Sequence, residues 1–489
     1  MPRNNHNEKD VQFIKGDTMR MSLLSEFMTL LCVLSLFSFA DATEKNITGT
    51  WRGTLSVRGM ELRIVFHIQL DTTGVLRGTM DSPDQGAKGI IVDEVRLRRD
   101  SVGLVVKIAA AGYDGVIQPG DSVIAGSWHQ GGLSFPLDLH HAEQATEALR
   151  PQEPKPPFPY DTEEVTYENK AAGVTLAGTL SKPKSPSPCP ALLLITGSGA
   201  QNRDEEIFGH KPFLLLADYL TRRGIAVLRV DDRGVGKSTG VFTTATTKDF
   251  AGDVLAGVQY LKSRNDVDGR KIGLLGHSEG GLIAPMVANE SKDVAFIVLL
   301  AGPSLPGDQI LCLQDSLISA AMGAPKESIN ERLRLMRHLH SLVKSESDTI
   351  KLRENIRFTI RQFLLADSTR AAANDSATVA AATAQLTSPW FMFFLKYDPA
   401  PALAKVSCPI LALNGEKDLQ VPARENIDGM MRAFKKSGNV KATARILPGL
   451  NHLFQKAETG AVIEYGKIDE TMNPEALRAI GDWISSVTH

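Results

Sequence analysis

The stretch "IGLLGHSEGG", residues 272–281, places Ser278 inside the pattern Gly-x-Ser-x-Gly. An apolar strand pattern, "KIGLLGH", precedes the serine, and a helical pattern, "EGGLIAPMVANE", follows it. At a tight strand-to-helix turn the flanking Gly276 and Gly280 avoid clashes that larger side chains would cause. Such a turn exposes the hydroxyl, which is a poor nucleophile until a base activates it. We expect Ser278 to be a nucleophile; an ordinary glycine-rich turn is the alternative.

The sequence offers one base and one acid in suitable places. His452, in "LPGLNHLF", follows the last predicted strand, and Asp418, in "LALNGEKDLQVP", follows the strand before it. The chain order Ser278, Asp418, His452 is a known nucleophile–acid–base order for serine catalysis. Glu416 and Asp308 are alternative acids, and a surface histidine is the alternative reading of His452.

An oxyanion needs two main-chain N–H groups. One is expected from Glu279, directly after the nucleophile. The other is expected from the loop "LLLITGSGAQNRDEE", with Ser198 as first choice and Gly199 as second; a simple turn is the alternative. The segment "DDRGVGKSTG" ends like a phosphate-binding loop, but Asp231 stands where its first glycine belongs, so we expect no nucleotide site.

Two further groups are candidates for substrate binding. The carboxylates of Glu205 and Glu206 could hold a substrate's amino group, or could simply form a solvated acidic pair. In "SPWFMFFLKYDP" the aromatic residues Trp390, Phe391 and Phe394 either line an acyl pocket or pack the surrounding helices together. We expect no metal site.

The elements that must position these residues alternate from residue 161 to residue 489. Eight apolar segments read as strands: "EEVTYEN", "VTLAGTL", "ALLLITG", "IAVLRVD", "KIGLLGH", "AFIVLLAG", "PILALNG" and "ATARILPG". Amphipathic helical patterns lie between them, which predicts a doubly wound, mostly parallel, eight-stranded sheet. A helix-rich insertion at about 303–400 interrupts the alternation and is expected to form a cap.

The region before this domain has a different pattern. Residues 43–149 combine alternating strands such as "ELRIVFHIQL" with frequent turn signals, which predicts a small all-β barrel or sandwich. A spacer is the expected role of this domain, and weak glycan binding is the alternative. Residues 150–160, "RPQEPKPPFPY", hold five prolines and are expected to form a stiff linker.

Residues 1–42 resemble a leader and export signal. The apolar run 30–40 is too short to span a membrane, and Ala40-Asp41-Ala42 fits the cleavage rule. We therefore expect a periplasmic or extracellular protein, with an uncleaved anchor as the alternative; Met19 and Met21 are alternative start residues. In the mature chain Cys189, Cys312 and Cys408 are expected to form no structural disulfide.

Composition excludes several classes of protein. The 489 residues are 43% hydrophobic and 22% charged, with a formal net charge of −2. That balance is typical of a globular protein and favours neither nucleic acid nor an anionic membrane as partner. The oligomeric state is left open.

Together, "GHSEGG", "DDRGVGKS", the Asp418 segment and the His452 loop resemble the α/β-hydrolase superfamily over residues 160–489. Within it the chain is similar to bacterial exported esterases and serine-aminopeptidase-type hydrolases with a helical cap. The resemblance implies a Ser-His-Asp triad, an acyl-enzyme intermediate and no cofactor. Many relatives carry His-Gly at the oxyanion loop, where this chain has Thr196-Gly197.

The resulting expectation is a serine carboxylesterase that cleaves small acyl esters. A serine peptidase or aminopeptidase acting on small peptides or amides is the alternative. A non-catalytic envelope protein that binds glycan through the β domain belongs to another class, and the complete set of triad residues argues against it.

Overall fold

The computed structural model describes residues 45–57, 60–82, 87–109, 111–130, 133–142, 150–184, 188–366 and 376–488. The predicted export signal, residues 1–42, lies outside the described residues. Among the described helices, none is both long and apolar enough to cross a membrane. Cys189, Cys312 and Cys408 are free thiols.

The N-terminal region is all-β, as the sequence predicts. Its sheet has the order β4-β3-β2-β1-β10-β8-β7-β6-β5, with β9 paired to β8, and neighbouring strands run antiparallel. Val92 of β4 and Val95 of β5, at opposite edges, pack into one core with Trp51 and Phe66. The sheet therefore curls around a single core. The elements are β1 (Gly49–Val57), β2 (Met60–Leu70), β3 (Leu76–Ser82), β4 (Ala87–Val92), β5 (Glu94–Arg98), β6 (Ser101–Val106), η2 (Lys107–Ala109), β7 (Ala111–Ile117), β8 (Val123–Gln130), β9 (Leu133–Pro136) and β10 (Leu139–Ala142).

A second sheet organises the rest of the chain. Its order is β11-β12-β14-β13-β15-β16-β17-β18; β11 and β12 pair antiparallel, as do β12 and β14, and the remaining pairs are parallel. The strands are β11 (Asp161–Asn169), β12 (Val174–Lys182), β13 (Cys189–Ile195), β14 (Ala226–Val230), β15 (Val267–His277), β16 (Val294–Leu300), β17 (Ile410–Gly415) and β18 (Ala442–Leu447).

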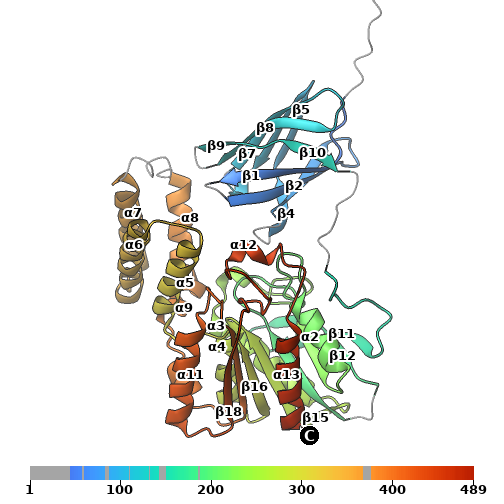
Figure 1. The fold of residues 1–489 in the computed structure, drawn as a ribbon, viewed down its shortest axis with the longest axis vertical. Helices are drawn as coiled ribbons and strands as arrows, with labels where there is room; N and C mark the ends of the chain where they lie inside the picture. Colours follow the sequence, from blue (N-terminus) through green and yellow to red (C-terminus); the bar gives the residue numbers. More distant parts are fainter. Residues whose placement is uncertain are drawn as a thin grey trace, which may run out of the picture. The chain divides into compact units, whose positions relative to one another are not determined.

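Helices cover both faces of this sheet, which explains why its central strands are apolar throughout. Two separate cores result, one beneath α3, α4 and α11 and the other beneath α2 and α13 (Figure 1). The helical elements outside the insertion are α2 (Pro212–Thr221), η3 (Phe242–Thr244), α3 (Thr247–Lys262), α4 (Gly280–Glu290), α10 (Ala400–Leu403), α11 (Ala423–Ser437), α12 (Val462–Tyr465) and α13 (Pro474–Thr488).

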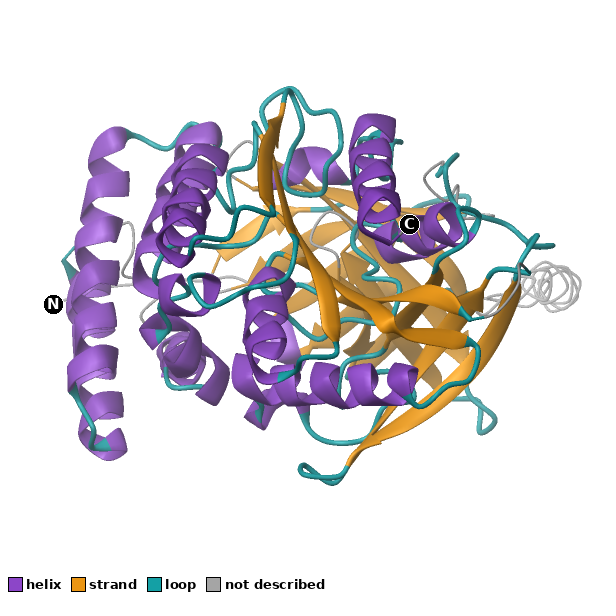
Figure 2. Cartoon of the chain, turned by 90° about the horizontal axis from the view of Figure 1, so that it is seen from below, coloured by secondary structure: helices purple, strands orange, loops and turns teal. Residues whose placement is uncertain are grey.

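Between β16 and β17 the chain forms the helical insertion. Its helices are α5 (Gly307–Ala321), α6 (Lys326–Ser345), α7 (Thr349–Leu365), α8 (Ser376–Leu386) and α9 (Pro389–Lys396). Val343, Leu352, Ile356 and Leu395 belong to a core that the insertion forms for itself. The insertion helices stand as a group beside the sheet (Figures 1 and 2).

The proline-rich segment 150–160 is fastened to the hydrolase-like domain. Arg150 Nη2 donates to the carbonyl oxygen of Phe208 at 2.7 Å, and Gln152 Nε2 donates to that of Met472 at 2.8 Å. At the far end, the Tyr160 hydroxyl donates to the carboxylate of Asp218 at 2.9 Å. The polar residues of this segment therefore attach it to the domain that follows.

Candidate active site

Ser278 lies on a sharp turn between β15 and α4. Its φ is 53°, in the left-handed region that non-glycine residues rarely adopt, and its N–H donates to the carbonyl oxygen of Leu300 at 2.8 Å. A Cβ added at Gly276 would overlap the carbonyl oxygen of Gly280, and one added at Gly280 would overlap that of Ile195. Both glycines of the pattern are therefore required by close backbone contacts.

Asp418 and His452 come together from the loops that follow β17 and β18. Asp418 Oδ2 lies 2.8 Å from His452 Nδ1, and both side chains are buried. The other oxygen, Oδ1, accepts from the main-chain N–H groups of Gln420 at 2.9 Å and Val421 at 2.8 Å. These bonds fix the carboxylate so that it faces the imidazole ring.

The loop that carries His452 is held by its own neighbours. The side-chain oxygen of Asn451 accepts from the main-chain N–H groups of Leu453 at 3.0 Å and Gln455 at 2.9 Å. The carbonyl oxygen of His452 lies 3.0 Å from His277 Nε2. The base candidate is thus anchored to the residue directly before Ser278.

The two alternative acids lie elsewhere. Glu416 is exposed and accepts from the N–H of Gly449 at 2.9 Å. Asp308 accepts from the ammonium group of Lys344 at 2.8 Å, within the helical insertion. The histidine therefore has Asp418 as its carboxylate partner.

Two carboxylates brace the loop that follows β13. Asp232 accepts from the Thr196 hydroxyl at 2.7 Å and from the N–H of Gln201 at 2.9 Å, at the two ends of the loop. Glu205 Oε1 accepts from the N–H of Gly197 at 2.7 Å. The N–H of Gly197 is therefore already used, although this glycine lies close to Ser278.

Unlike the N–H of Gly197, the N–H groups of the predicted oxyanion donors have no acceptor among the described residues. Within the described part of the chain, the main-chain N–H groups of Ser198, Gly199 and Glu279 make no hydrogen bond to another protein group. Ser198 and Gly199 are exposed, and Glu279 begins the turn into α4. All three groups are available to a ligand.

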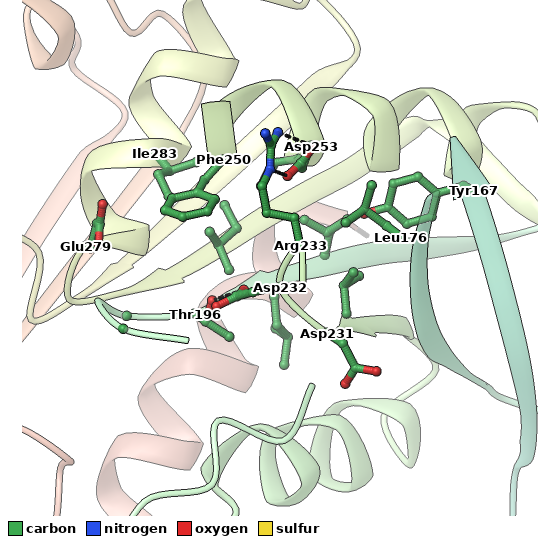
Figure 3. A pocket seen from close by; sticks show the side chains of 17 residues that line it. Tyr167, Leu176, Thr196, Asp231, Asp232, Arg233, Phe250, Asp253, Glu279 and Ile283 are labelled. Carbon is green, nitrogen blue, oxygen red and sulfur yellow. Dashed lines mark hydrogen bonds and ion pairs between the residues drawn. The ribbon is translucent and has the colours of Figure 1, made fainter. Parts of the chain in front are cut away.

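A cavity opens beside this loop (Figure 3). Gly197, Gly199 and Glu279 line the cavity, and so do Arg233 and Asp253, which form an ion pair. Apolar side chains make up most of the remaining lining: Tyr167, Leu176, Leu193, Leu194, Ile195, Val230, Phe250, Val254 and Ile283.

Two buried carboxyl groups at this cavity, those of Asp232 and Glu279, have raised pKa values. Burial raises the pKa of Asp232 to about 7, and the charges of Glu205 and Glu279 act in the same direction. Burial also raises the pKa of Glu279, although hydrogen bonds from the Thr247 hydroxyl and the Trp390 indole partly oppose the shift. Each hydrogen bond goes to Oε1 of Glu279, at 2.6 and 2.8 Å.

Trp390 of α9 contacts two apolar clusters, whereas Phe391 and Phe394 each belong to one of them. Trp390 stacks on Phe394 at 5.1 Å between ring centres, and both contact a cluster that includes Leu282 of α4. Phe391 instead faces the insertion's own core. None of the three lines the cavity, but Trp390 reaches the site through its hydrogen bond to Glu279.

Glu205 and His277 form a second histidine–carboxylate pair, which the sequence analysis did not identify. Glu205 Oε1 lies 3.0 Å from His277 Nδ1, and both side chains are buried. Glu205 is therefore directed at His277 rather than at the cavity mouth, and only Glu206 of the two predicted amine ligands is partly exposed. The one feature of the sequence that could have indicated this pair is the position of His277 directly before Ser278.

Comparison with known proteins identifies the family. A family model described as "Serine aminopeptidase, S33" matches residues 211–458, just over half of the chain. The chain belongs to the serine aminopeptidase S33 family. It is therefore a serine hydrolase with the α/β-hydrolase fold, and Ser278 and His452 both lie within the matched residues.

Individual proteins are also similar to part of this chain. Esterase EstD of Thermotoga maritima is 26% identical over 318 residues, which are 64% of this chain and 67% of that protein. The α/β-hydrolase GrgF of Penicillium sp. sh18 shares 17% identity over 68% of this chain and 99% of its own, with a TM-score of 0.42. The Pyrococcus furiosus esterase PF2001 shares 14% identity over 71% of this chain and 100% of its own, with a TM-score of 0.41.

Proposed function

We propose that this S33-family hydrolase cleaves carboxylic esters of small acyl groups through a triad of Ser278, His452 and Asp418. The observation that carries the proposal is the buried Asp418–His452 pair at 2.8 Å, on a loop bonded to the residue before Ser278. The resemblance to Esterase EstD supports ester hydrolysis as the reaction.

In the first half of the reaction, the Ser278 oxygen attacks the ester carbonyl carbon and its proton passes to His452 Nε2. Asp418 accepts the hydrogen bond from Nδ1, so the ring keeps the tautomer with a free Nε2 and the imidazolium is stabilised. The tetrahedral intermediate collapses as the C–O bond to the alcohol breaks, and His452 returns the proton to that alcohol. An acyl group remains on Ser278.

Water completes the cycle. His452 removes a proton from water, whose oxygen attacks the acyl-enzyme; the second tetrahedral intermediate then releases the acid and restores the Ser278 hydroxyl. The negative oxygen of both intermediates is stabilised by the N–H of Glu279 with that of Ser198 or Gly199. Their lack of protein partners supports this assignment, as does the use of the Gly197 N–H by Glu205.

We place the acyl group in the cavity beside the oxyanion loop. Its lining includes Gly199 and Glu279 and also the Arg233–Asp253 ion pair. An ion pair with both side chains nearly buried resists displacement by an apolar chain, which limits acyl length. We therefore expect acetyl and butyryl esters to be better substrates than octanoyl esters.

The direct test replaces Ser278 by Ala and measures release of nitrophenol from nitrophenyl acetate and butyrate. Turnover should fall about 10⁴-fold or more, as is typical when a triad residue is removed. The circular dichroism spectrum should not change, because the turn accepts a small side chain. Ester turnover at the wild-type rate would refute the proposed function.

A peptidase acting on small peptides or amides is the second candidate, favoured by the family description and by the carboxyl groups at the cavity. The buried carboxyl group of Glu279 could accept a hydrogen bond from a substrate's amino group, since among the described residues the protein donors reach only its Oε1. Turnover of aminoacyl-nitroanilides well above that of nitrophenyl esters would favour this candidate.

We also propose that the protein acts outside the cytoplasm, because residues 1–42 have the composition of an export signal. The β domain is then a spacer, with weak glycan binding as the alternative. N-terminal sequencing of the secreted protein should begin near residue 43; a retained N-terminus would indicate an anchor.

A further inference from the structure

We propose that His277 and Glu205 are positioning residues for the reaction. They hold the oxyanion loop and the His452 loop in place next to Ser278, and they do so only while His277 carries a positive charge. This inference rests on the proposed function, because it assigns a role to groups around that triad. It concerns residues that would touch neither the substrate nor the reacting atoms.

With Glu205 ionised, the hydrogen-bonding pattern favours the charged form of His277. The carbonyl oxygen of His452 can only accept a hydrogen bond, so His277 Nε2 must carry a proton. Glu205 Oε1 accepts from the N–H of Gly197 and also faces His277 Nδ1. An ionised carboxylate opposite a bare Nδ1 lone pair would be repulsive, whereas a protonated Nδ1 gives a buried ion pair.

These bonds join three loops that carry the candidate catalytic groups. His277 itself ends β15 and immediately precedes Ser278. Its Nε2 holds the loop of His452, and through Glu205 its Nδ1 side is connected to Gly197 of the oxyanion loop. One imidazolium is therefore the shared fixed point for nucleophile, base and oxyanion donors.

The backbone around Glu205 supports a specific role. Glu205 has a φ of 50°, in the left-handed region, which costs a non-glycine residue free energy and persists only where the surroundings impose it. A Cβ at Gly197 would lie 3.3 Å from both Glu205 Oε1 and the Ser278 Cβ. Little room remains for the carboxylate or the loop to move independently.

The charges that face His277 come from three loops. Burial disfavours the imidazolium, but the charge and hydrogen bond of Glu205 outweigh it, and the His452 carbonyl and the charge of Asp418 add to them. The His452 ring lies 4.8 Å away, and Asp232 lies beyond Glu205 near the loop it braces. The net effect raises the pKa of His277 above its usual value.

The sign of the pH dependence follows. A group whose pKa is raised in the folded protein keeps its ion pair at lower pH and loses it as pH rises through that raised pKa. Loss of the Nδ1 proton would repel Glu205, release Gly197 and loosen the oxyanion loop. The wild-type profile of kcat should therefore fall on the alkaline side, in addition to the rise that a neutral His452 requires.

The experiment measures kcat and KM for nitrophenyl butyrate from pH 5.5 to 10 in the full chain, with Glu205→Gln as the test variant. A neutral amide can accept from Gly197 but cannot stabilise the imidazolium. The alkaline limb should move to lower pH by about one unit, and kcat at pH 8 should fall about 10- to 100-fold with KM changed less than threefold.

Glu458→Gln is the matched control, because it removes the same charge from an exposed residue six positions after His452. Its profile should coincide with that of the wild type. An active-site count with a fluorophosphonate probe corrects kcat for any unfolded fraction, so a purely structural effect would lower the count and leave the pH midpoints in place. Unmoved midpoints in Glu205→Gln would overturn the inference.

The triad and the positioning role can be refuted separately. An inactive Ser278→Ala protein together with an unshifted Glu205→Gln profile would leave the esterase in place and refute the positioning role. Full activity of Ser278→Ala would refute the triad itself. A shift in Glu205→Gln with no shift in Glu458→Gln supports the positioning role.

Discussion

Two histidine–carboxylate pairs lie side by side in this molecule and differ in what the second ring nitrogen faces. In both, Nδ1 meets a buried carboxylate, at 2.8 Å for His452 and 3.0 Å for His277, and the ring centres are 4.8 Å apart. His277 Nε2 is committed to a carbonyl oxygen, whereas within the described residues His452 Nε2 makes no hydrogen bond to protein. We propose that a histidine paired with a carboxylate serves as a fixed charge at His277 and carries a movable proton at His452.

Replacing Asp418 by Asn should have the larger effect of the two carboxylate changes. The amide cannot hold the His452 ring in the tautomer that leaves Nε2 free, so kcat for nitrophenyl butyrate should fall about 10³- to 10⁴-fold at neutral pH. KM should change little. If this loss were no greater than that in Glu205→Gln, the two pairs would have equivalent roles and the contrast between them would be wrong.

Glu416→Gln is the control for that experiment. Glu416 is two residues from Asp418 in the sequence, but its exposed carboxylate accepts a hydrogen bond from the N–H of Gly449 and does not face His452. Activity should stay within about twofold of wild type. A large loss in this variant with activity retained in Asp418→Asn would move the acid by two residues.

Thermal unfolding should separate the pairs without relying on turnover. In the inactive Ser278→Ala background, the Tm of the protein should decrease between pH 7 and pH 10 as His277 loses its proton, because its pKa is raised in the folded state. Adding Glu205→Gln should flatten this dependence, since the ion pair is then absent. Equal slopes for the two proteins would show that the pair contributes no pH-dependent stability.

Local patterns were sufficient to predict where the candidate triad residues lie in the fold. Ser278 is marked by flanking glycines, which close backbone contacts require, and Asp418 and His452 each follow an apolar strand. All eight strand segments of the second domain occur in the sheet. These features are visible because a turn or a buried strand restricts the residue types at neighbouring positions.

Contacts between distant segments could not be predicted in this way. Glu205 and His277 are 72 residues apart, and nothing in "NRDEEIF" indicates that one acid is buried and the other partly exposed. The cavity is formed from β12, β13, β14 and α3 rather than from the aromatic cluster of α9. The packing of strands and helices determines which acidic and aromatic side chains come into contact. The local amino-acid sequence does not indicate these contacts.

The smallest expected effect concerns Glu279, whose carboxyl group lies outside both pairs. Trp390→Phe removes the indole donor while keeping an aromatic ring against Phe394. We expect a two- to fivefold change in the ratio of kcat/KM for acetyl and butyryl esters, with the two pairs undisturbed. Phe391→Ala, whose ring faces the insertion's own core, should lower Tm and leave that ratio unchanged. A ratio that moves equally in both variants would assign all these aromatics to packing.

The attachment of segment 150–160 bears on how the catalytic half can be separated from the rest. Arg150 reaches the carbonyl oxygen of Phe208, three residues beyond Glu205, and Gln152 bonds to the chain at Thr471 and Met472, beyond the His452 loop. A gene fragment that starts at residue 161 would omit both anchors, whereas one that starts at residue 150 would retain them. Recombinant excision and domain exchange should therefore cut ahead of the prolines, because this strip of chain belongs to the enzyme that follows it.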